Sequence, residues 1–191
     1  MKKTLLTIVL TVLVCCTVLG STYALLMQKT GTIENTFTVG NINIELTETG
    51  ADANGKQTFK IIPGTNITKD PKVTVKAKSE ACWLFVVVKA TQIPTFMTYS
   101  VASGWTEYTG ATIAGSKIYY RSVGAADAEN GVSYPVIAGN TITVSKDVTK
   151  AQIDAVTTNP ELSFTALAVQ AENVTTVDAA WTAIGSLLTN P

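Results

Sequence analysis

The sequence predicts an all-β protein, a sandwich or barrel of short strands with short helices in its connections and one helix near its C-terminal end. Two observations lead to this prediction. Short runs rich in β-branched and aromatic residues are separated by glycine and proline turns. After the last run, apolar residues recur at helical spacing. With 191 residues, 46% of them hydrophobic and 15% charged, the composition is that of one globular domain.

The first 24 residues have the pattern of a secretory signal peptide. Lys2 and Lys3 form a basic n-region, and an uncharged apolar stretch runs from Thr4 to Leu19. Small and turn-forming residues then place the expected cut between Ala24 and Leu25. We therefore predict a signal peptide over residues 1–24 and an exported single domain over residues 25–191.

An uncleaved membrane anchor is the competing interpretation of this leader. No charged residue occurs from Thr4 to Gln28, which is long enough to span a bilayer. Gly20-Ser21-Thr22 interrupts the apolar run where a cut is expected, and this favours cleavage. Contact with a membrane is expected only through the uncleaved leader.

The composition excludes several classes of function. Loss of Lys2 and Lys3 with the leader leaves 12 basic and 14 acidic residues, a net charge of −2, so nothing attracts nucleic acid. Without histidine, neither a Ser-His-Asp triad nor an HExxH zinc site can form. We therefore predict no enzyme, no metal and no cofactor. Cys82, the cysteine left after removal of the leader, is expected to be a buried small hydrophobic residue.

The first strand is expected within Asn35 to Glu48. Its apolar set changes from odd-numbered to even-numbered positions at Gly40-Asn41, where a β-bulge would keep both sets toward the core. The odd set is Phe37 and Val39, and the even set is Ile42, Ile44 and Leu46. Asp52-Ala53-Asn54-Gly55 then predicts a turn.

Further strands are expected at runs with the same alternation. They are Thr58–Ile62, a run opened by Pro71 with Val73, Val75 and Ala77 on one face, Ala81–Ala90, Met97–Val101, Trp105–Thr109, Lys117–Val123, Ser133–Ser145 and Leu162–Gln170. Ala81–Ala90 is apolar on both faces, so it is expected to be central. The C-terminal helix is the expected cover of its outer side.

Two helices are predicted. Ser145 is the N-cap candidate of a short helix reaching Val156. Thr175 or Thr176 is expected to cap the C-terminal helix, with Asp178 favouring the positive end of its dipole. The apolar stripe of that helix is Val177, Ala180, Trp181, Ile184 and Leu188.

Three stretches carry a family resemblance. They are Thr22-Tyr23-Ala24 with Asn35-Thr36-Phe37-Thr38-Val39-Gly40-Asn41, Ile61-Ile62-Pro63-Gly64 leading into Pro71-Lys72-Val73, and Ala168-Val169-Gln170-Ala171-Glu172 followed by Ala179-Ala180-Trp181. In this order and spacing they resemble the TasA/camelysin family of exported biofilm-matrix proteins, over nearly the whole mature chain.

The resemblance implies a jelly-roll sandwich, secreted by a Gram-positive bacterium and cut by a SipW-type signal peptidase. It also implies a homopolymeric extracellular fibre, with a possible accessory matrix protein, in which the N-terminal segment enters the neighbouring subunit as a strand. The donor segment would be residues 25–33, with Leu25, Leu26, Met27 and Ile33 as its apolar side chains. The peptidase activity credited to camelysin is not carried over, because the chain has no histidine to hold zinc in the usual way.

A monomeric secreted or surface-associated binding module is the alternative function. Trp105, Tyr108, Tyr119 and Tyr120 would suit stacking on a glycan if they were exposed. A camelysin-type peptidase is the third reading of the family resemblance.

Overall fold

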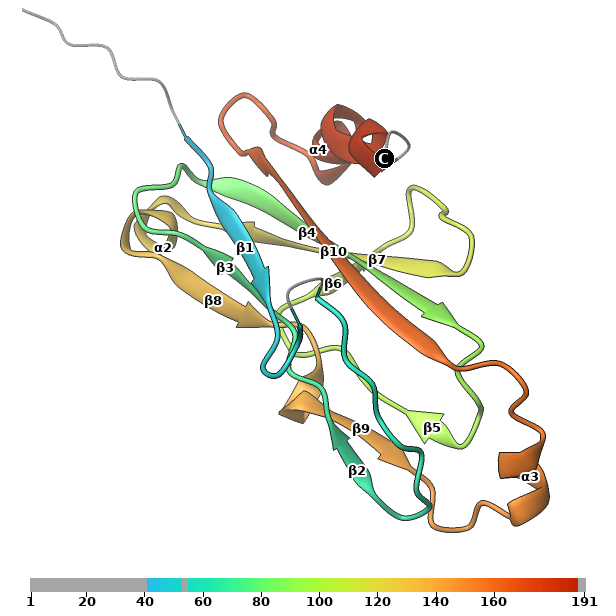
Figure 1. The fold of residues 1–191 in the computed structure, drawn as a ribbon. Helices are drawn as coiled ribbons and strands as arrows, with labels where there is room; N and C mark the ends of the chain where they lie inside the picture. The colour runs from blue at the N-terminus through green and yellow to red at the C-terminus, as the bar shows by residue number, and fades with distance from the viewer. Residues whose placement is uncertain (1–40, 53–54, 189–191) are drawn as a thin grey trace, which may run out of the picture. The chain divides into compact units, whose positions relative to one another are not determined.

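The computed structural model describes residues 41–52 and 55–188, and every structural statement below concerns these residues. The protein is all-β, with three antiparallel sheets and a few short helices (Figure 1). The signal peptide, the cleavage position at Ala24 and Leu25, the donor residues Leu25, Leu26, Met27 and Ile33, and the expected bulge at Gly40 lie outside the described residues.

The largest sheet has four strands in the order β10-β4-β7-β6. They are β10 (Glu161–Gln170), β4 (Cys82–Thr91), β7 (Ser116–Val123) and β6 (Thr106–Tyr108). Two three-stranded sheets have the orders β1-β3-β8 and β2-β9-β5. Their strands are β1 (Ile44–Thr47), β3 (Lys72–Val75), β8 (Val132–Pro135), β2 (Asn66–Thr68), β9 (Thr141–Val144) and β5 (Met97–Thr98).

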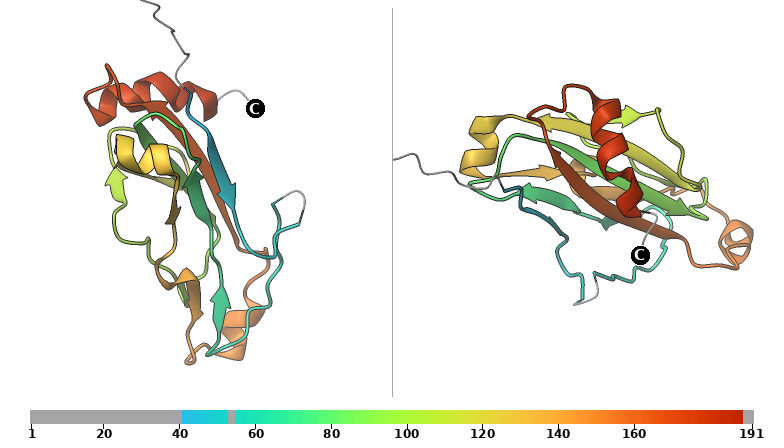
Figure 2. Two further views of the ribbon diagram at one scale, coloured as in Figure 1. Left: turned by 90° about the vertical axis from the view of Figure 1, so that its left-hand side faces the viewer. Right: turned by 90° about the horizontal axis from the view of Figure 1, so that it is seen from above.

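The two three-stranded sheets continue one another. The chain runs from β2 into β3 and from β8 into β9 after short breaks. Two main-chain hydrogen bonds cross these breaks, from Lys69 N to Asn140 O at 2.9 Å and from Val136 N to Pro71 O at 2.8 Å. Together they form one layer that faces the four-stranded sheet (Figure 2).

The central strand β4 is buried on both faces, as its sequence predicts. Its even-numbered residues from Cys82 to Val88 join a core cluster with Val73 and Val75 of β3. Its odd-numbered residues, among them Phe85, join a second cluster with Ala180 and Ile184. The two clusters lie on opposite sides of the same sheet because side chains alternate along a strand.

The outer cluster is covered by α4 (Val177–Ile184), which continues as the 3₁₀ turn Gly185–Leu188. Thr176 caps the helix by accepting a hydrogen bond from Ala179 N at 3.2 Å. The ring of Trp181 packs on Phe85 with centroids 5.4 Å apart. The predicted cap, apolar stripe and position of this helix are confirmed.

A third apolar cluster is formed by side chains of the β2-β9-β5 sheet. It contains Ile67, Met97, Ile142 and Val144, with partly buried neighbours that include Ile61 and Leu162. The three clusters leave four large hydrophobic side chains exposed among the described residues: Leu46, Phe59, Ile62 and Leu187.

The predicted strand Thr58–Ile62 is wrong, because these residues form no β-ladder and are irregular. Their contacts are made by side chains, and Phe59 and Ile62 are 38% and 50% exposed. The predicted inward set of the first strand is also only partly right, since Leu46 is 37% exposed.

The bounds of several other elements differ from the predicted ones because of local contacts and turns. The helix expected from Ser145 is α3 (Lys150–Asp154), capped by Thr149, whose side chain and Gln152 form a capping box. Ser145 precedes the helix by five residues, and its hydroxyl instead accepts from Asp147 N at 3.2 Å in a local turn. The expected long strand Ser133–Ser145 is broken into β8 and β9 by the 3₁₀ turn Ala138–Asn140, in which Gly139 has a φ of 61°.

Two further differences concern short elements. The run Met97–Val101 forms a strand only at Met97–Thr98, followed by a single bridge from Val101 to Ile137. The helix α2 (Ala125–Asn130) was not predicted from the sequence. It has only six residues and no side-chain N-cap, and its end signals are limited to Asp127 in the first turn and Gly131 after its last residue.

The packing of α4 over β4 predicts that substitutions at two nearby residues, Ile184 and Leu187, differ in their effect on stability. Ile184 is 5% exposed and Leu187 is 63% exposed. We expect Ile184→Ala to lower the free energy of unfolding by about 2–4 kcal/mol, because it leaves a cavity against Phe85. Leu187→Ala is the control, with an expected change below about 0.5 kcal/mol. Urea unfolding of both variants measures the difference, and equal effects would contradict the packing of α4.

Candidate functional site at the β10 edge

Strand β10 is the outermost strand of the four-stranded sheet. It pairs with β4 over ten residues in one uninterrupted register, from Glu161 opposite Thr91 to Gln170 opposite Cys82. On its other side it pairs with no strand among the described residues. Alternate N–H and C=O groups of β10 therefore point outward without a ladder partner.

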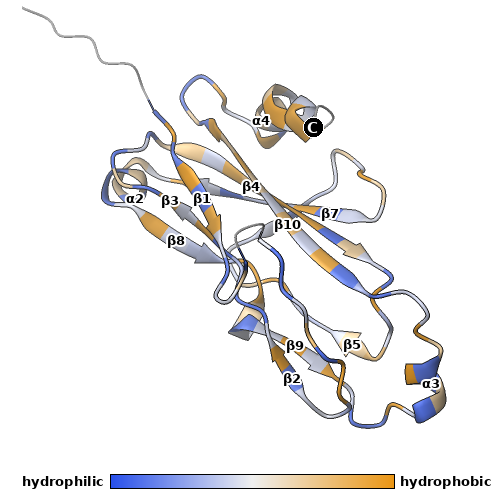
Figure 3. Cartoon of the chain, viewed as in Figure 1, coloured by the Kyte–Doolittle hydropathy of each residue, from blue (hydrophilic) through white to orange (hydrophobic). Residues whose placement is uncertain are grey.

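The β10 edge lacks the devices that usually protect sheet edges. Edge strands are normally short, bulged, or guarded by lysine, proline or other charges. From Leu162 to Gln170 the strand has no charged residue and no proline, and its register contains no bulge. Figure 3 shows apolar residues recurring along it. A long, flat, apolar edge of this kind is a template for pairing with another chain.

The other edge strands of the described sheets are better protected. They have four residues or fewer. The β1 edge carries Glu45, paired with Lys76 at 3.2 Å. The β6 edge carries Glu107, paired with Lys117 at 3.1 Å. Strand β8 ends at Pro135. The β10 edge is therefore the exception.

Residues Thr58–Ile62, which we call the strap, lie beside the Glu161 end of β10 (Figures 1 and 2). Ile61 packs in the same cluster as Leu162 of β10. Within the described chain, no main-chain hydrogen bond is made by the strap from Thr58 to Ile61. The strap is therefore held by its side chains.

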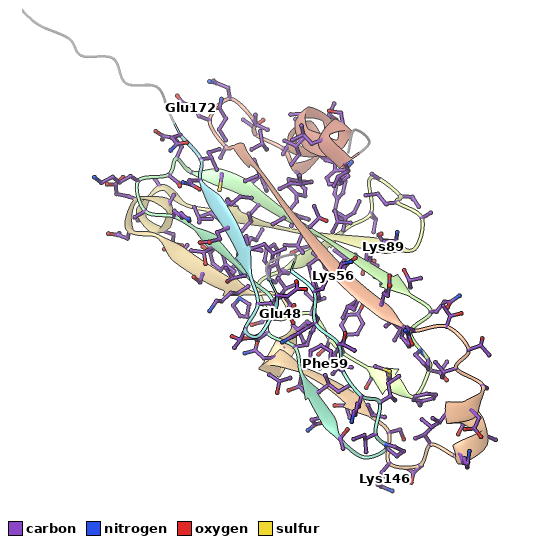
Figure 4. All side chains as sticks on the ribbon, in the orientation of Figure 1. Glu48, Lys56, Phe59, Lys89, Lys146 and Glu172 are labelled. Carbon is purple, nitrogen blue, oxygen red and sulfur yellow. The ribbon has the colours of Figure 1, made fainter. Side chains whose placement is uncertain are left out.

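Lys69 is the main anchor under the strap. It is only 8% exposed, and its Nζ lies 2.7 Å from Glu48 Oε2. The same Nζ is 5.6 Å from the ring centre of Phe59 in the strap and 5.7 Å from that of Phe164 in β10. An ammonium group at these distances is attracted by both rings, so one lysine ties the strap to β10. Glu48 and Phe59 lie on the same side of the molecule in Figure 4.

Two neighbouring contacts hold the segment that leads into the strap. Gln57 Nε2 donates to Thr49 O at 2.7 Å. Thr49 in turn donates its hydroxyl and its N–H to the carboxylate of Asp70, at 2.7 and 3.0 Å. The hydroxyl hydrogen bond from Thr49 lowers the pKa of Asp70 below its usual value.

Polar atoms without partners gather in this region. Among the described residues, four buried side-chain nitrogen or oxygen atoms have no hydrogen-bond partner. Three of them are Thr47 Oγ1 at the end of β1 and Glu48 Oε1 and Gln57 Oε1 in the connection between β1 and the strap. Buried polar groups nearly always have a hydrogen-bond partner in folded proteins, so this side of the molecule has room for further polar contacts.

The four aromatic residues considered for glycan stacking do not form one platform. Tyr108 and Tyr120 belong to the cluster under α4, and Tyr108 is only 8% exposed. Tyr108 also donates its hydroxyl to Asp178 Oδ1 at 2.9 Å. Trp105 and Tyr119 pack against the cluster on the opposite face of the sheet.

Trp105 has structural partners of its own. Its Nε1 donates to Pro135 O at 2.8 Å. The guanidinium carbon of Arg121 lies 5.3 Å from the centre of the Trp105 ring and 3.5 Å from that of Tyr134. Burial lowers the pKa of Arg121 below its usual value. These contacts give Trp105 and Tyr134 a structural role in the packing of the protein.

Two features of the described residues bear on metal binding and on proton transfer. They contain no group of three His, Cys, Asp or Glu side chains placed to hold a metal ion. A shallow hollow of about 410 Å³ between the β4–β5 connection and α3 is lined by Phe96, Val156 and uncharged neighbours. Nothing in that lining can take up or release a proton near neutral pH.

The sequence did not single out Lys69, Glu48 or the β10 edge. The buried lysine carries no local signal, because its partners come from three separate stretches of the chain. The edge does carry one, since Leu162–Gln170 is uncharged where an exposed edge strand would be expected to have lysine.

Comparisons with known proteins give no relative. No protein-family model, no curated protein and no solved structure matches this chain. Within the described ranges, the helices are all too short or too polar to cross a membrane.

The burial of Cys82 predicts low thiol reactivity. Cys82 is fully buried, and burial raises the pKa of its thiol to about 11, so little thiolate forms at pH 8. We expect the protein starting at Leu25 to leave Ellman's reagent unreacted while folded, and to release one equivalent when denatured. Lys146→Cys, at an exposed position, is the reactive control. Rapid labelling of the folded protein without this substitution would show that Cys82 is accessible.

The ion pair between Lys69 and Glu48 under the strap predicts that the stability of the protein depends strongly on both residues. Lys69→Met alone leaves Glu48 buried without its cation, and we expect the free energy of unfolding to fall by about 3 kcal/mol. Replacing both, as Lys69→Met with Glu48→Leu, is expected to restore most of this loss. The exposed pair Lys150–Asp154 is the control, and Lys150→Ala should change stability by less than about 0.5 kcal/mol.

Proposed function

We propose that this protein is a structural subunit of an extracellular biofilm-matrix fibre. In this proposal the chain is a TasA/camelysin-like protein of a Gram-positive bacterium, secreted after a SipW-type signal peptidase cuts between Ala24 and Leu25. The freed N-terminal segment of one subunit then adds as a strand to the next, so that the partner is a second copy of the same chain.

The observation that carries this proposal is the β10 edge. A strand of ten residues with uncharged side chains after Glu161 offers an unpaired edge to an added strand, with β1 lying close to part of it. Main-chain pairing of this kind supplies affinity, and the alternating side chains of the added strand supply specificity.

We also class the sandwich as a jelly roll as part of this proposal. The chain changes layers between β3 and β4, between β4 and β5, between β5 and β6, between β7 and β8, and between β9 and β10. Repeated crossing between two facing layers is typical of Greek-key connections, from which jelly rolls are built.

The estimated free energies favour strand exchange between subunits only if main-chain hydrogen bonds form along β10. Burial of Leu25, Leu26, Met27 and Ile33 gives roughly 6–12 kcal/mol in total. Association costs about 4–15 kcal/mol, so side-chain burial alone is close to balance. Pairing along β10 adds on the order of ten hydrogen bonds, each contributing about 0.5–1.5 kcal/mol net, which favours the complex.

Head-to-tail exchange also determines the form of the assembly. The donor segment and the β10 edge are different surfaces, so the contact is heterologous. Unless the rotation between subunits closes a ring, such a contact grows into a filament. An accessory matrix protein that starts or ends the filament is compatible with this geometry.

The alternatives have less support. A monomeric glycan-binding module would need an aromatic platform, and Tyr108 and Tyr120 pack on the opposite face of the sheet from Trp105 and Tyr119. A camelysin-type peptidase would need residues able to hold zinc, and the sequence has no histidine.

The fibre proposal predicts the behaviour of three purified proteins. The chain starting at Leu25 is expected to form filaments by electron microscopy and to elute as large species at high concentration. Deletion of residues 25–31 is expected to leave a folded monomer. Thr165→Lys, an exposed lysine on the β10 edge, is expected to slow filament growth on the order of tenfold, because it protects the edge.

Thr106→Lys on the β6 edge is the matched control, and it should leave filament growth unchanged. A chain starting at Leu25 that stays monomeric at all concentrations, with or without residues 25–31, would refute the fibre function.

A further inference from the structure

The strap combines a strand-forming sequence with an unpaired main chain. Thr58-Phe59-Lys60-Ile61-Ile62 is rich in aromatic and β-branched residues, which favour strands. Its main chain from Thr58 to Ile61 nevertheless makes no hydrogen bond within the described chain. A segment of this type has the sequence of a strand but lacks the neighbour that would make it one.

The side chains of the strap already hold it in place. Phe59 packs on the Lys69 ammonium group, and Ile61 lies in the third apolar cluster beside Leu162. Gln57 anchors its beginning through Thr49. Because these anchors leave the N–H and C=O groups free, a new strand can pair with the strap without breaking a main-chain hydrogen bond.

The strap also keeps apolar surface exposed next to the β10 edge. Phe59 and Ile62 are 38% and 50% exposed and are two of the four large hydrophobic residues exposed in the described chain. The unpartnered oxygens of Glu48 and Gln57 lie in the connection that leads to the same segment. Apolar side chains, free main-chain groups and unsatisfied oxygens therefore occur together on one side of the molecule.

We propose that the strap is the second wall of the strand-accepting site. The N-terminal segment of a second copy lies between β10 and the strap, and the strap changes from an unpaired segment to a β-strand hydrogen-bonded to it. This inference rests on the proposed fibre function and names a partner surface within it.

The proposed fibre function makes a second copy the occupant, and the start of the described chain is compatible with it. Glu80 N donates to Asn41 O at 2.9 Å, and Ala171 N donates to Ala81 O at 2.8 Å. Asn41 therefore lies near the Gln170 end of β10, whereas the strap lies near the Glu161 end. To reach its own strap, a molecule's segment would have to run the whole length of its own β10, whereas the segment of a second copy can enter at the Glu161 end.

The length of the outlying segment also fits. Leu25 to Gly40 are 16 residues, which span about 53–58 Å when fully extended. A ten-residue strand such as β10 is about 33 Å long. The segment of a second copy can therefore pair along all of β10 and still connect to its own domain.

Amide hydrogen exchange tests the inference directly on the chain starting at Leu25. In the soluble monomer, the amides of Phe59 to Ile61 are expected to exchange rapidly, because they have no hydrogen-bond partner. In the assembled protein we expect protection of these amides to rise on the order of 100-fold, together with that of β10.

A proline variant gives an independent measurement. Lys60→Pro removes an N–H that is unpaired in the monomer, so Tm is expected to change by about 3 °C or less. In the filament the same proline blocks pairing with the added strand, and we expect growth to slow on the order of tenfold.

Ala114→Pro is the matched control. Ser116 N donates to Ile113 O, and Gly115 has a φ of 71°, so Ala114 occupies the second position of a turn that accepts proline. This turn joins β6 to β7, away from the β10 edge. Ala114→Pro is expected to assemble at the rate of the unsubstituted protein.

The outcomes separate the two proposals. If filaments form while the strap amides keep exchanging rapidly and β10 gains protection, the strap inference is wrong and the fibre function stands. Assembly of Lys60→Pro at the unsubstituted rate would have the same meaning. If the unsubstituted chain never assembles, both proposals fail.

Discussion

The fold depends on one constraint, which is that β4 is apolar on both faces and must be covered on both. Cys82, Leu84, Val86 and Val88 require the facing layer of short strands, and Phe85 and Val87 require α4. The strand is also paired on both sides, by β10 and by β7. On one side of β4 the sheet continues through β7 to β6, and on the other side it ends at β10 among the described residues, so the outer edge of β10 faces the strap.

The strap, which lies beside the β10 edge, is held by charge and aromatic contacts. Lys69 is nearly buried between Glu48 and the rings of Phe59 and Phe164. A lysine in this position loses most of its hydration, and the carboxylate and the two rings replace it in part. The arrangement holds the strap close to β10, and among the described residues the strap main chain from Thr58 to Ile61 has no hydrogen-bond partner.

Much of the fold follows from local sequence patterns. The ten-residue apolar run gave the central strand, and Thr176 followed by the apolar stripe gave α4. These predictions succeed because both burial on two faces and helix capping can be recognised from residues that are adjacent in the sequence. Side-chain alternation also placed Val73 and Val75 in the core.

The failures have a common physical cause. Thr58–Ile62 has the composition of a strand, yet pairing depends on a partner that local sequence does not specify. The helix expected from Ser145 begins after Thr149, because Thr149 and Gln152 form a capping box while the Ser145 hydroxyl accepts from Asp147 N in a local turn. The contacts of Lys69 with Glu48, Phe59 and Phe164 join three distant stretches, so no pattern in the sequence predicts them.

An unprotected edge raises the question of why two β10 edges would not simply pair with each other. Such a contact uses the same surface on both molecules, so it forms a closed dimer and ends growth. In the proposed fibre the strap would oppose this dimer, because Phe59 and its Lys69 anchor lie beside the Glu161 end of β10, where a second domain needs more room than a single extended segment. An added strand, unlike a paired sheet, would leave the β10 edge of its own molecule free for the next subunit. Under that proposal the strap favours filament growth over dimerisation once the donor segment has been freed by cleavage.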